Sequence, residues 1–160
     1  MKLLVLIAAI VSSCLALFNA CGISAIPSNR FFTPEEHINL GVAYEHSHDL
    51  EAAVKEYKAA SREIPIAYLY LGNVFFQRGQ FEEAEKAYRK AIDKTNDPGA
   101  CNNLAWLYYT RDVNLDEAEK LAMEAVNADP ANEEFRDTLT RIREKRTIKI
   151  IYQGPDNEKR

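Results

Sequence analysis

The sequence predicts an all-α fold built from repeated helical hairpins, and the prediction depends on two periodic patterns. One short apolar signature occurs three times, as NLGVAY, YLGNVF and NLAWLY at residues 39–44, 70–75 and 103–108. Its small residues, 31 and then 33 positions apart, are Gly41, Gly72 and Ala105. Such a period is typical of stacked helix-turn-helix units, which build binding surfaces more often than reaction centres.

A second pattern follows the first in step and predicts two helices in each repeat. Alanines recur twelve or thirteen residues after each small residue and again seven residues later, at Ala53, Ala84, Ala118, Ala60, Ala91 and Ala125. Small residues on both helices of a hairpin allow the helices to approach closely. Tyr57 and Tyr88 lie four residues after an alanine, on the same helical face, and are expected to fill the space between helices.

Capping residues and prolines set the expected boundaries. Thr33 offers a hydroxyl cap, Pro34 fits the first helical position and Glu36 completes a capping box. Pro65 and Pro130 lie five residues after an alanine of the second helix, where a proline ends a helix. The expected repeats, all within one domain at residues 34–146, span residues 34–64, 65–97 and 98–130.

The last part of the chain is expected to form a capping helix and a tail. Asn132 can cap a helix over residues 131–146, in which Phe135, Leu139 and Ile142 face the core. The tail, residues 147–160, begins with the strand-favouring residues 148–152, which either pack on the last helix or add an edge strand to a partner.

The two patterns together resemble the tetratricopeptide repeat (TPR) family, from about Pro34 to Pro130. The resemblance implies a right-handed superhelical stack of about three TPR hairpins plus the C-terminal capping helix. The chain departs from the family pattern in a short first repeat, one extra residue near Val113 and Ala122 in place of the usual aromatic residue.

In the family, first-helix residues line a concave groove that binds a protein or peptide. The positions that the resemblance assigns to this groove are Ile38, Val42, Leu69, Tyr70, Asn73, Phe76, Asn102, Asn103, Trp106 and Tyr109, with Glu45 and Gln77 at further groove positions. Some members hold a chaperone's C-terminal carboxylate with Lys and Arg. The matching positions here are occupied by residues without positive charge, namely Ile38, Leu69, Glu134 and Thr138. This clamp is therefore not expected.

The N-terminus predicts export and lipid anchoring. Lys2 precedes an uncharged apolar run from Leu3 to Ala20, the layout of a signal peptide at residues 1–20. Cys21 then resembles the lipidated residue of bacterial lipoproteins, followed by a tether to residue 33, whereas Cys14 is the alternative site. An uncleaved transmembrane anchor is the other alternative. Gly22 is not the Asp that commonly retains lipoproteins at the inner membrane, which favours the periplasmic face of the outer membrane.

No residue pattern predicts catalysis or a cofactor. His46 and His48 are two positions apart, in a turn where polar residues are expected, so no metal site is predicted. His37 and Cys101 are at the family's aromatic position and are expected to pack in the repeats, with Cys101 a buried thiol. The net charge of −4 and the absence of a basic face argue against a nucleic-acid partner.

The expected function is that of a lipid-anchored periplasmic scaffold or assembly factor in the bacterial cell envelope, for example in pilus or secretion machinery. The expected partners are a protein or peptide in the groove and a membrane through the N-terminal lipid, with no small-molecule substrate. The alternative is a non-catalytic accessory subunit of a periplasmic enzyme complex, which co-purification of an enzyme would favour.

Overall fold

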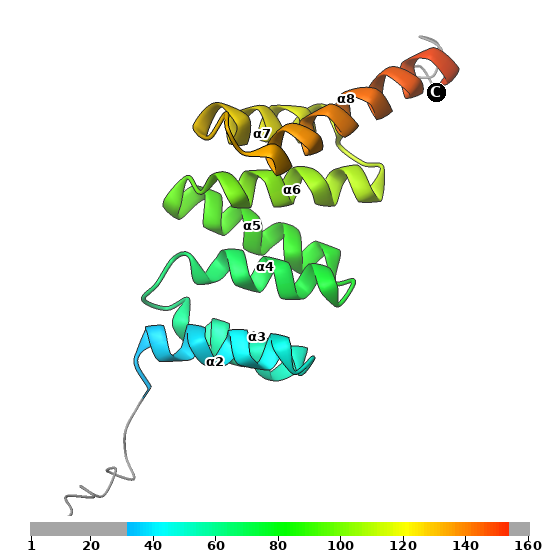
Figure 1. Cartoon of the computed structure of the whole chain (residues 1–160). Coiled ribbons are helices and arrows are strands. Elements are labelled where there is room, and N and C mark those ends of the chain that lie inside the picture. The colour runs from blue at the N-terminus through cyan, green and yellow to red at the C-terminus, as the bar shows by residue number, and fades with distance from the viewer. Residues whose placement is uncertain (1–31, 154–160) are drawn as a thin grey trace, which may run out of the picture. The chain divides into compact units, whose positions relative to one another are not determined.

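The computed structural model describes residues 32–153 and contains only helices in that range (Figure 1). Three hairpins follow one another along the chain: α2 (Pro34–His46) with α3 (Leu50–Ala60), α4 (Ala67–Gln77) with α5 (Phe81–Thr95), and α6 (Pro98–Arg111) with α7 (Leu115–Ala128). The last helix is α8 (Glu133–Gln153), so the predicted all-α repeat fold is confirmed.

Each hairpin makes its most extensive contacts internally, and α3 then packs on α4, and α5 on α6, so that the hairpins stack in chain order (Figure 1). Helix α8 packs mainly on α7 and also touches α6. The predicted signal peptide, Cys14, Cys21 and most of the tether lie outside the described residues, as does the end of the tail at residues 154–160. Within the described range no helix is long and apolar enough to span a membrane.

The predicted caps are present at the first and last helices. The Thr33 side chain accepts a hydrogen bond from the Glu36 amide at 3.2 Å, and Glu36 accepts one from the Thr33 amide at 2.9 Å. Asn132 accepts a hydrogen bond from the Phe135 amide at 3.2 Å. These bonds satisfy donors that a helix N-terminus leaves without an intrahelical partner.

The extra residue of the third repeat is absorbed in the turn between α6 and α7. Asp112 and Asn114 adopt left-handed backbone angles, with φ of 54° and 48°, a conformation that Asn and Asp tolerate better than most residues. Val113 between them is 41% exposed. Asn114 makes no side-chain cap, because its backbone is used to reverse the chain rather than to enter the helix in an extended conformation.

In each of the first two hairpins, a glycine of the first helix allows the second helix to approach closely. A Cβ atom built on Gly41 would lie 2.8 Å from Tyr57 Cζ, and one on Gly72 would lie 3.0 Å from Tyr88 Cγ, with other ring atoms nearer still. Tyr57 and Tyr88 are 0% and 2% exposed. The rings of the second helices therefore rest directly on the glycine backbone of the first helices, as the small-residue spacing predicted.

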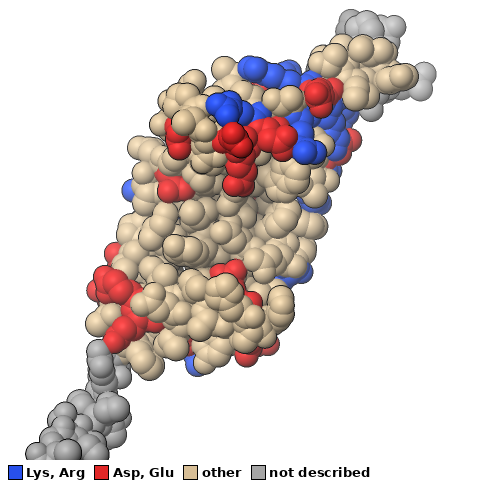
Figure 2. Space-filling model, viewed as in Figure 1, with Lys and Arg blue, Asp and Glu red and all other residues tan. Residues whose placement is uncertain are grey.

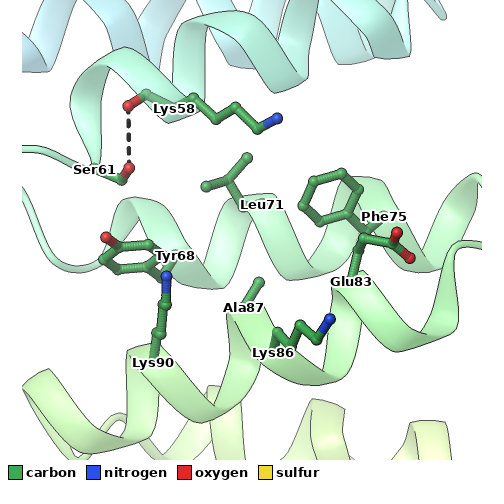
Figure 3. A pocket seen from close by; sticks show the side chains of 9 residues that line it. All are labelled: Lys58, Ser61, Tyr68, Leu71, Phe75, Glu83, Lys86, Ala87 and Lys90. Carbon is green, nitrogen blue, oxygen red and sulfur yellow. Dashed lines mark hydrogen bonds between the residues drawn. The ribbon is translucent and has the colours of Figure 1, made fainter.

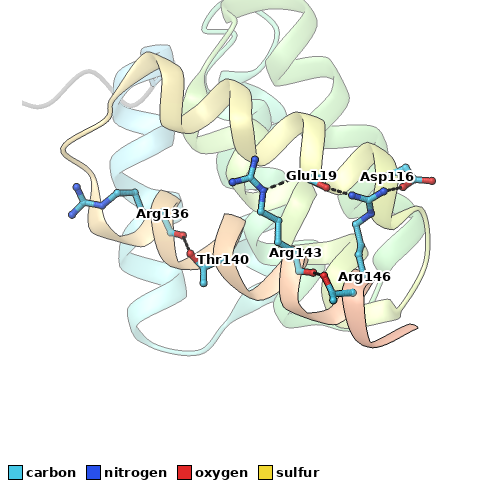
Figure 4. Close-up of polar contacts among 7 residues, drawn as sticks. Asp116, Glu119, Arg136, Thr140, Arg143 and Arg146 are labelled. Carbon is cyan, nitrogen blue, oxygen red and sulfur yellow. Dashed lines mark hydrogen bonds and ion pairs between the residues drawn. The ribbon is translucent and has the colours of Figure 1, made fainter. Parts of the chain in front are cut away.

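Helix α8 is fixed to α7 by charged pairs (Figure 4). Arg143 Nε donates to Glu119 Oε1 at 2.8 Å, and Arg146 binds both Glu119 and Asp116. Figure 2 shows Lys, Arg, Asp and Glu side chains gathered together over the α7–α8 end of the stack, above a largely uncharged face. The Glu119 side chain is only 15% exposed, so its pairs are less screened than surface pairs.

The end of α8 differs from the expected tail. The helix continues past residue 146 to Gln153, and Lys149 Nζ reaches Asp112 Oδ2 at 3.4 Å. Both alternatives for residues 148–152, packing on the last helix and adding an edge strand, are therefore wrong, because these residues are part of that helix. A strand needs a partner edge to satisfy its backbone, whereas a helix satisfies its own. The β-branched residues point into solvent instead: Ile148, Ile150 and Ile151 are 55%, 67% and 69% exposed.

Low pH is expected to weaken the packing of α8 on α7. The pKa of Glu119 lies below its ordinary value of 4.5, chiefly because Arg143 donates a hydrogen bond to the carboxylate, with the charge of Arg146 adding to the effect. A depressed folded-state pKa gives stability that is complete above about pH 4.5 and is lost as the pH falls through the folded value.

We expect Glu119→Gln to lower the free energy of unfolding near neutral pH and to flatten its decrease below about pH 4.5. Urea unfolding followed by circular dichroism at a series of pH values measures both effects. Asp93→Asn, on the exposed surface of α5, is the matched control and should leave the profile unchanged. A Glu119→Gln profile that superimposes on the wild-type profile would show that these pairs contribute nothing.

Candidate functional site

The first helices of the three repeats meet around a small hollow. This inner hollow has a volume of about 260 Å³ and is lined by Glu45, Asn73, Phe76, Gln77, Tyr88, Asn103 and Trp106. Glu45 comes from α2, the next three residues from α4, Tyr88 from α5 and the last two from α6. Residues from all three repeats therefore contribute to one surface.

Asn73 is the central polar group of the inner hollow. Its Oδ1 accepts a hydrogen bond from the Tyr88 hydroxyl at 3.0 Å and one from Asn103 Nδ2 at 2.8 Å. Burial raises the pKa of Tyr88, so the hydroxyl stays protonated and donates at all ordinary pH values. The two bonds join the second hairpin to the third and fix the direction of the Asn73 amide.

Glu45 organises the other end of the inner hollow. The carboxylate accepts a hydrogen bond from Gln77 Nε2 at 3.1 Å and another from the Tyr57 hydroxyl. The pKa of Tyr57 is raised by burial and further by the nearby Glu45 charge, so Tyr57 also remains a donor. Tyr70 stacks on the Tyr57 ring with a centroid distance of 5.2 Å.

The aromatic end of the inner hollow is built by α6. Trp106 stacks on Tyr109 with ring centroids 5.0 Å apart and an interplanar angle of 28°. Lys145 of α8 donates to the Tyr109 carbonyl at 2.8 Å and places its ammonium 4.7 Å from the Tyr109 ring centroid. The capping helix therefore holds this stacked pair from the C-terminal side.

The structure brings together only part of the groove predicted from the sequence. Asn73, Phe76, Asn103 and Trp106 line the inner hollow. The other predicted positions are partly buried side chains that pack against the core, namely Ile38, Val42, Leu69, Tyr70 and Tyr109. Asn102 is 2% exposed, so the structure does not bring it to a surface that a peptide could reach.

Tyr88 was not among the predicted groove residues, because its position in the second helix marks it as a core residue. The residue is 2% exposed and belongs to the core, yet it lines the inner hollow, where its hydroxyl donates to Asn73. A buried tyrosine usually directs its hydroxyl to a polar partner, and that rule is the signal by which the residue could have been found.

The predicted packing roles of His37 and Cys101 are confirmed. His37 Nδ1 lies 2.6 Å from Glu56 Oε2 on α3, and its ring meets Phe32 edge to face at 5.7 Å. Cys101 is 5% exposed. Across residues 32–153, no group of three or more His, Cys, Asp or Glu side chains lies in a position to hold a metal ion.

Cys101 should react slowly in the folded protein. Burial raises the pKa of its thiol to about 11, and the charges of Glu124 and Asp97 add to the shift. The thiolate is the reactive form, so at neutral pH modification should be at least about a hundredfold slower than in denaturant. Ellman's reagent on a Cys14→Ser, Cys21→Ser variant measures this rate, and equal rates in the folded and unfolded states would contradict the burial.

Known proteins share this architecture. The tetratricopeptide repeat family model matches residues 65–94, which contain the hairpin α4–α5. No curated protein matches the chain in sequence. The predicted resemblance to the tetratricopeptide repeat family is confirmed, with the family model matching the second hairpin.

Several solved structures share this fold. The first TPR domain of the Spaghetti protein, bound to an HSP90 peptide, aligns with a TM-score of 0.67 and 17% identity over 72% of this chain and 94% of that domain. The TPR domain of Sgt2 from Aspergillus fumigatus has a TM-score of 0.66 and 16% identity over 77% and 83%. The Arabidopsis OM64 TPR domain has a TM-score of 0.63 and 20% identity over 69% and 94%. At these identities the likeness is one of fold.

Proposed function

We propose that this protein is a non-catalytic scaffold that holds a peptide segment of a partner protein in the inner hollow. We propose further that a lipid on Cys21 anchors it to the periplasmic face of the outer membrane, where it assists the assembly of an envelope machine such as a pilus or a secretion apparatus. The observation that carries the scaffold proposal is the polar and aromatic lining to which all three repeats contribute.

The chemistry of the inner hollow suits a peptide backbone. No residue within 32–153 accepts a hydrogen bond from Asn73 Nδ2 or from Trp106 Nε1. Both donors belong to residues that line the inner hollow, and Asn73 is held by the bonds that its Oδ1 accepts. Fixed donors beside the Phe76 and Trp106 rings can bind peptide carbonyl groups and an apolar side chain together.

The composition of the hollow also indicates what kind of segment it binds. The Spaghetti domain is bound to the acidic HSP90 peptide SRMEEVD. In this chain Ile38 and Leu69 pack against the core, Thr138 is 3% exposed, and Glu45 adds a negative charge to the hollow. A neutral or basic segment with an apolar residue is therefore a better fit than an acidic C-terminus.

A substitution at Trp106 tests the groove. Full-length protein with Trp106→Ala, used as bait in bacterial envelope extracts, should retain the partner at least about tenfold less well than the wild type, because an interface tryptophan commonly contributes about 2 kcal/mol. Trp106→Phe should retain part of the binding. Unchanged retention by Trp106→Ala, with the helical circular dichroism intact, would contradict the proposal.

Intact mass tests the lipid anchor separately. The protein purified from bacterial membranes should have the mass of a chain that begins at acylated Cys21, and Cys21→Ala should abolish this species. A mass that begins at Cys14 would move the lipid to that residue. An unprocessed mass would contradict the lipid anchor and favour a transmembrane one, without bearing on the inner hollow.

A further inference from the structure

A second hollow lies on the other side of α4 and shares no residue with the inner hollow. It has a volume of about 310 Å³ and is formed by α3, α4 and α5 (Figure 3). On α4, Tyr68, Leu71 and Phe75 line this outer hollow, whereas Asn73, Phe76 and Gln77 line the inner one. At 100° per residue these two sets lie on opposite faces of the helix.

The floor of the outer hollow is apolar. Leu71 is 3% and Ala87 5% exposed, and the half-buried rings of Tyr68 and Phe75 stand beside them. In Figure 3 the Leu71 and Phe75 side chains project from α4 into the space between α3 and α5. Apolar surface that stays open to water in this way gains free energy when another apolar group covers it.

The rim of the outer hollow is positively charged. Lys58 of α3 and Lys86 and Lys90 of α5 surround the floor, and Glu83 is the one acidic residue of the lining. The Lys58 ammonium lies 5.8 Å from the Phe75 ring centroid, and the Lys90 ammonium lies 5.3 Å from that of Tyr68.

No carboxylate within residues 32–153 forms an ion pair with any of these three lysines. The chain carries a net charge of −4, so this rim is a locally positive site on an acidic protein. Unpaired ammonium groups beside an apolar floor are complementary to carboxylates that flank an apolar side chain.

We propose that the outer hollow binds an acidic peptide segment of a partner protein, with one large apolar side chain on the Leu71–Phe75 floor and carboxylates against the three lysines. The volume is close to the lower limit of small-ligand sites, about 300 Å³, and suits one anchoring side chain. This site goes beyond the groove function, because it lies on the opposite face of α4 and selects the opposite charge.

The two stretches that flank the described residues do not have the composition of such a segment. Residues 1–31 contain no Asp or Glu. Residues 154–160 contain Asp156 and Glu158 but no large apolar side chain. Neither stretch therefore combines carboxylates with a large apolar side chain.

The test uses the full-length protein in detergent and a fluorescein-labelled peptide, Asp-Glu-Phe-Glu-Asp, with binding followed by fluorescence anisotropy. Replacing Lys58, Lys86 and Lys90 by Ala should weaken binding at least about tenfold, whereas replacing the exposed Lys55, Lys94 and Lys120 by Ala should change it less than about twofold. A peptide with Ala for Phe should also bind about tenfold more weakly. Trp106→Ala should have no effect, which separates this site from the groove.

Three results would overturn the proposal. One is the absence of peptide binding by the wild type at about millimolar concentration. Another is equal weakening by the two triple variants, which would reduce the effect to net charge. The third is binding to phosphatidylglycerol vesicles through the same lysines without peptide binding, which would make the site a lipid contact. Circular dichroism shows whether each variant is folded. If the triple variant is not folded, the single variant Lys90→Ala, at an exposed position, tests the same point and is expected to weaken binding about threefold.

Discussion

Replacing Gly72 by alanine is expected to lower the free energy of unfolding by about 2–3 kcal/mol, although the change adds one methyl group. That methyl would overlap the Tyr88 ring, which is 2% exposed and cannot move outward without breaking its hydrogen bond to Asn73. The overlap must therefore be relieved by separating α4 from α5. Urea unfolding followed by circular dichroism measures the loss.

Two comparisons make the Gly72 result specific. Gly79→Asn adds a larger side chain at a position with φ of 69°, where the added Cβ would meet no atom within 4 Å beyond its chain neighbours, so it should change stability by less than about 0.5 kcal/mol. Tyr88→Ala combined with Gly72→Ala should cost less than the sum of the single changes, because the ring that the methyl meets is gone. A Gly72→Ala protein as stable as the wild type would show that the hairpin does not need this close approach.

Replacing Asn73 by leucine is expected to have the second large effect, a loss of about 2 kcal/mol in unfolding free energy. The change removes the acceptor of two hydrogen bonds and leaves the Tyr88 hydroxyl unpaired in a buried place. Partner binding in the inner hollow should fall as well, because the Asn73 amide is one of its donors. Urea unfolding measures the first effect and partner retention by the immobilised protein measures the second.

Gln77→Leu is the matched control for Asn73→Leu, since Gln77 also lines the inner hollow but is exposed and, among the described residues, pairs only with Glu45. It should cost less than about 0.5 kcal/mol. Tyr88→Phe placed on Asn73→Leu should recover part of the loss by removing the unpaired hydroxyl. If Asn73→Leu is as stable as Gln77→Leu, the hydrogen bonds at Asn73 do not hold the second and third hairpins together.

The fold could be predicted from the sequence because the two helices of each repeat meet the same steric requirement. Gly41 and Gly72 accompany Tyr57 and Tyr88, and where the third repeat has Ala105 it also has Ala122 in place of the ring. All of these residues are buried in the structure. A spacing that is repeated for a steric reason strongly indicates a repeat fold, even where the residues themselves change.

The site could be predicted only in part, because groove positions transferred from a family do not say how deeply each side chain lies. Asn102 and Asn103 are adjacent and equally polar, yet Asn102 is buried and Asn103 lines the inner hollow. The strand-favouring residues at the end of α8 likewise gave a wrong prediction, because β-propensity depends on context and these residues continue a helix that is already formed.

Photo-crosslinking tests the central claim most directly. Benzoylphenylalanine is placed at Phe76, which lines the inner hollow, or at Lys120, which is exposed on α7, in full-length protein in bacterial membranes. The account predicts that a partner protein is crosslinked from Phe76 and not from Lys120, and that Trp106→Ala removes the crosslink. A partner crosslinked equally from both positions, or from Lys120 alone, would show that the inner hollow is not where this scaffold holds its partner.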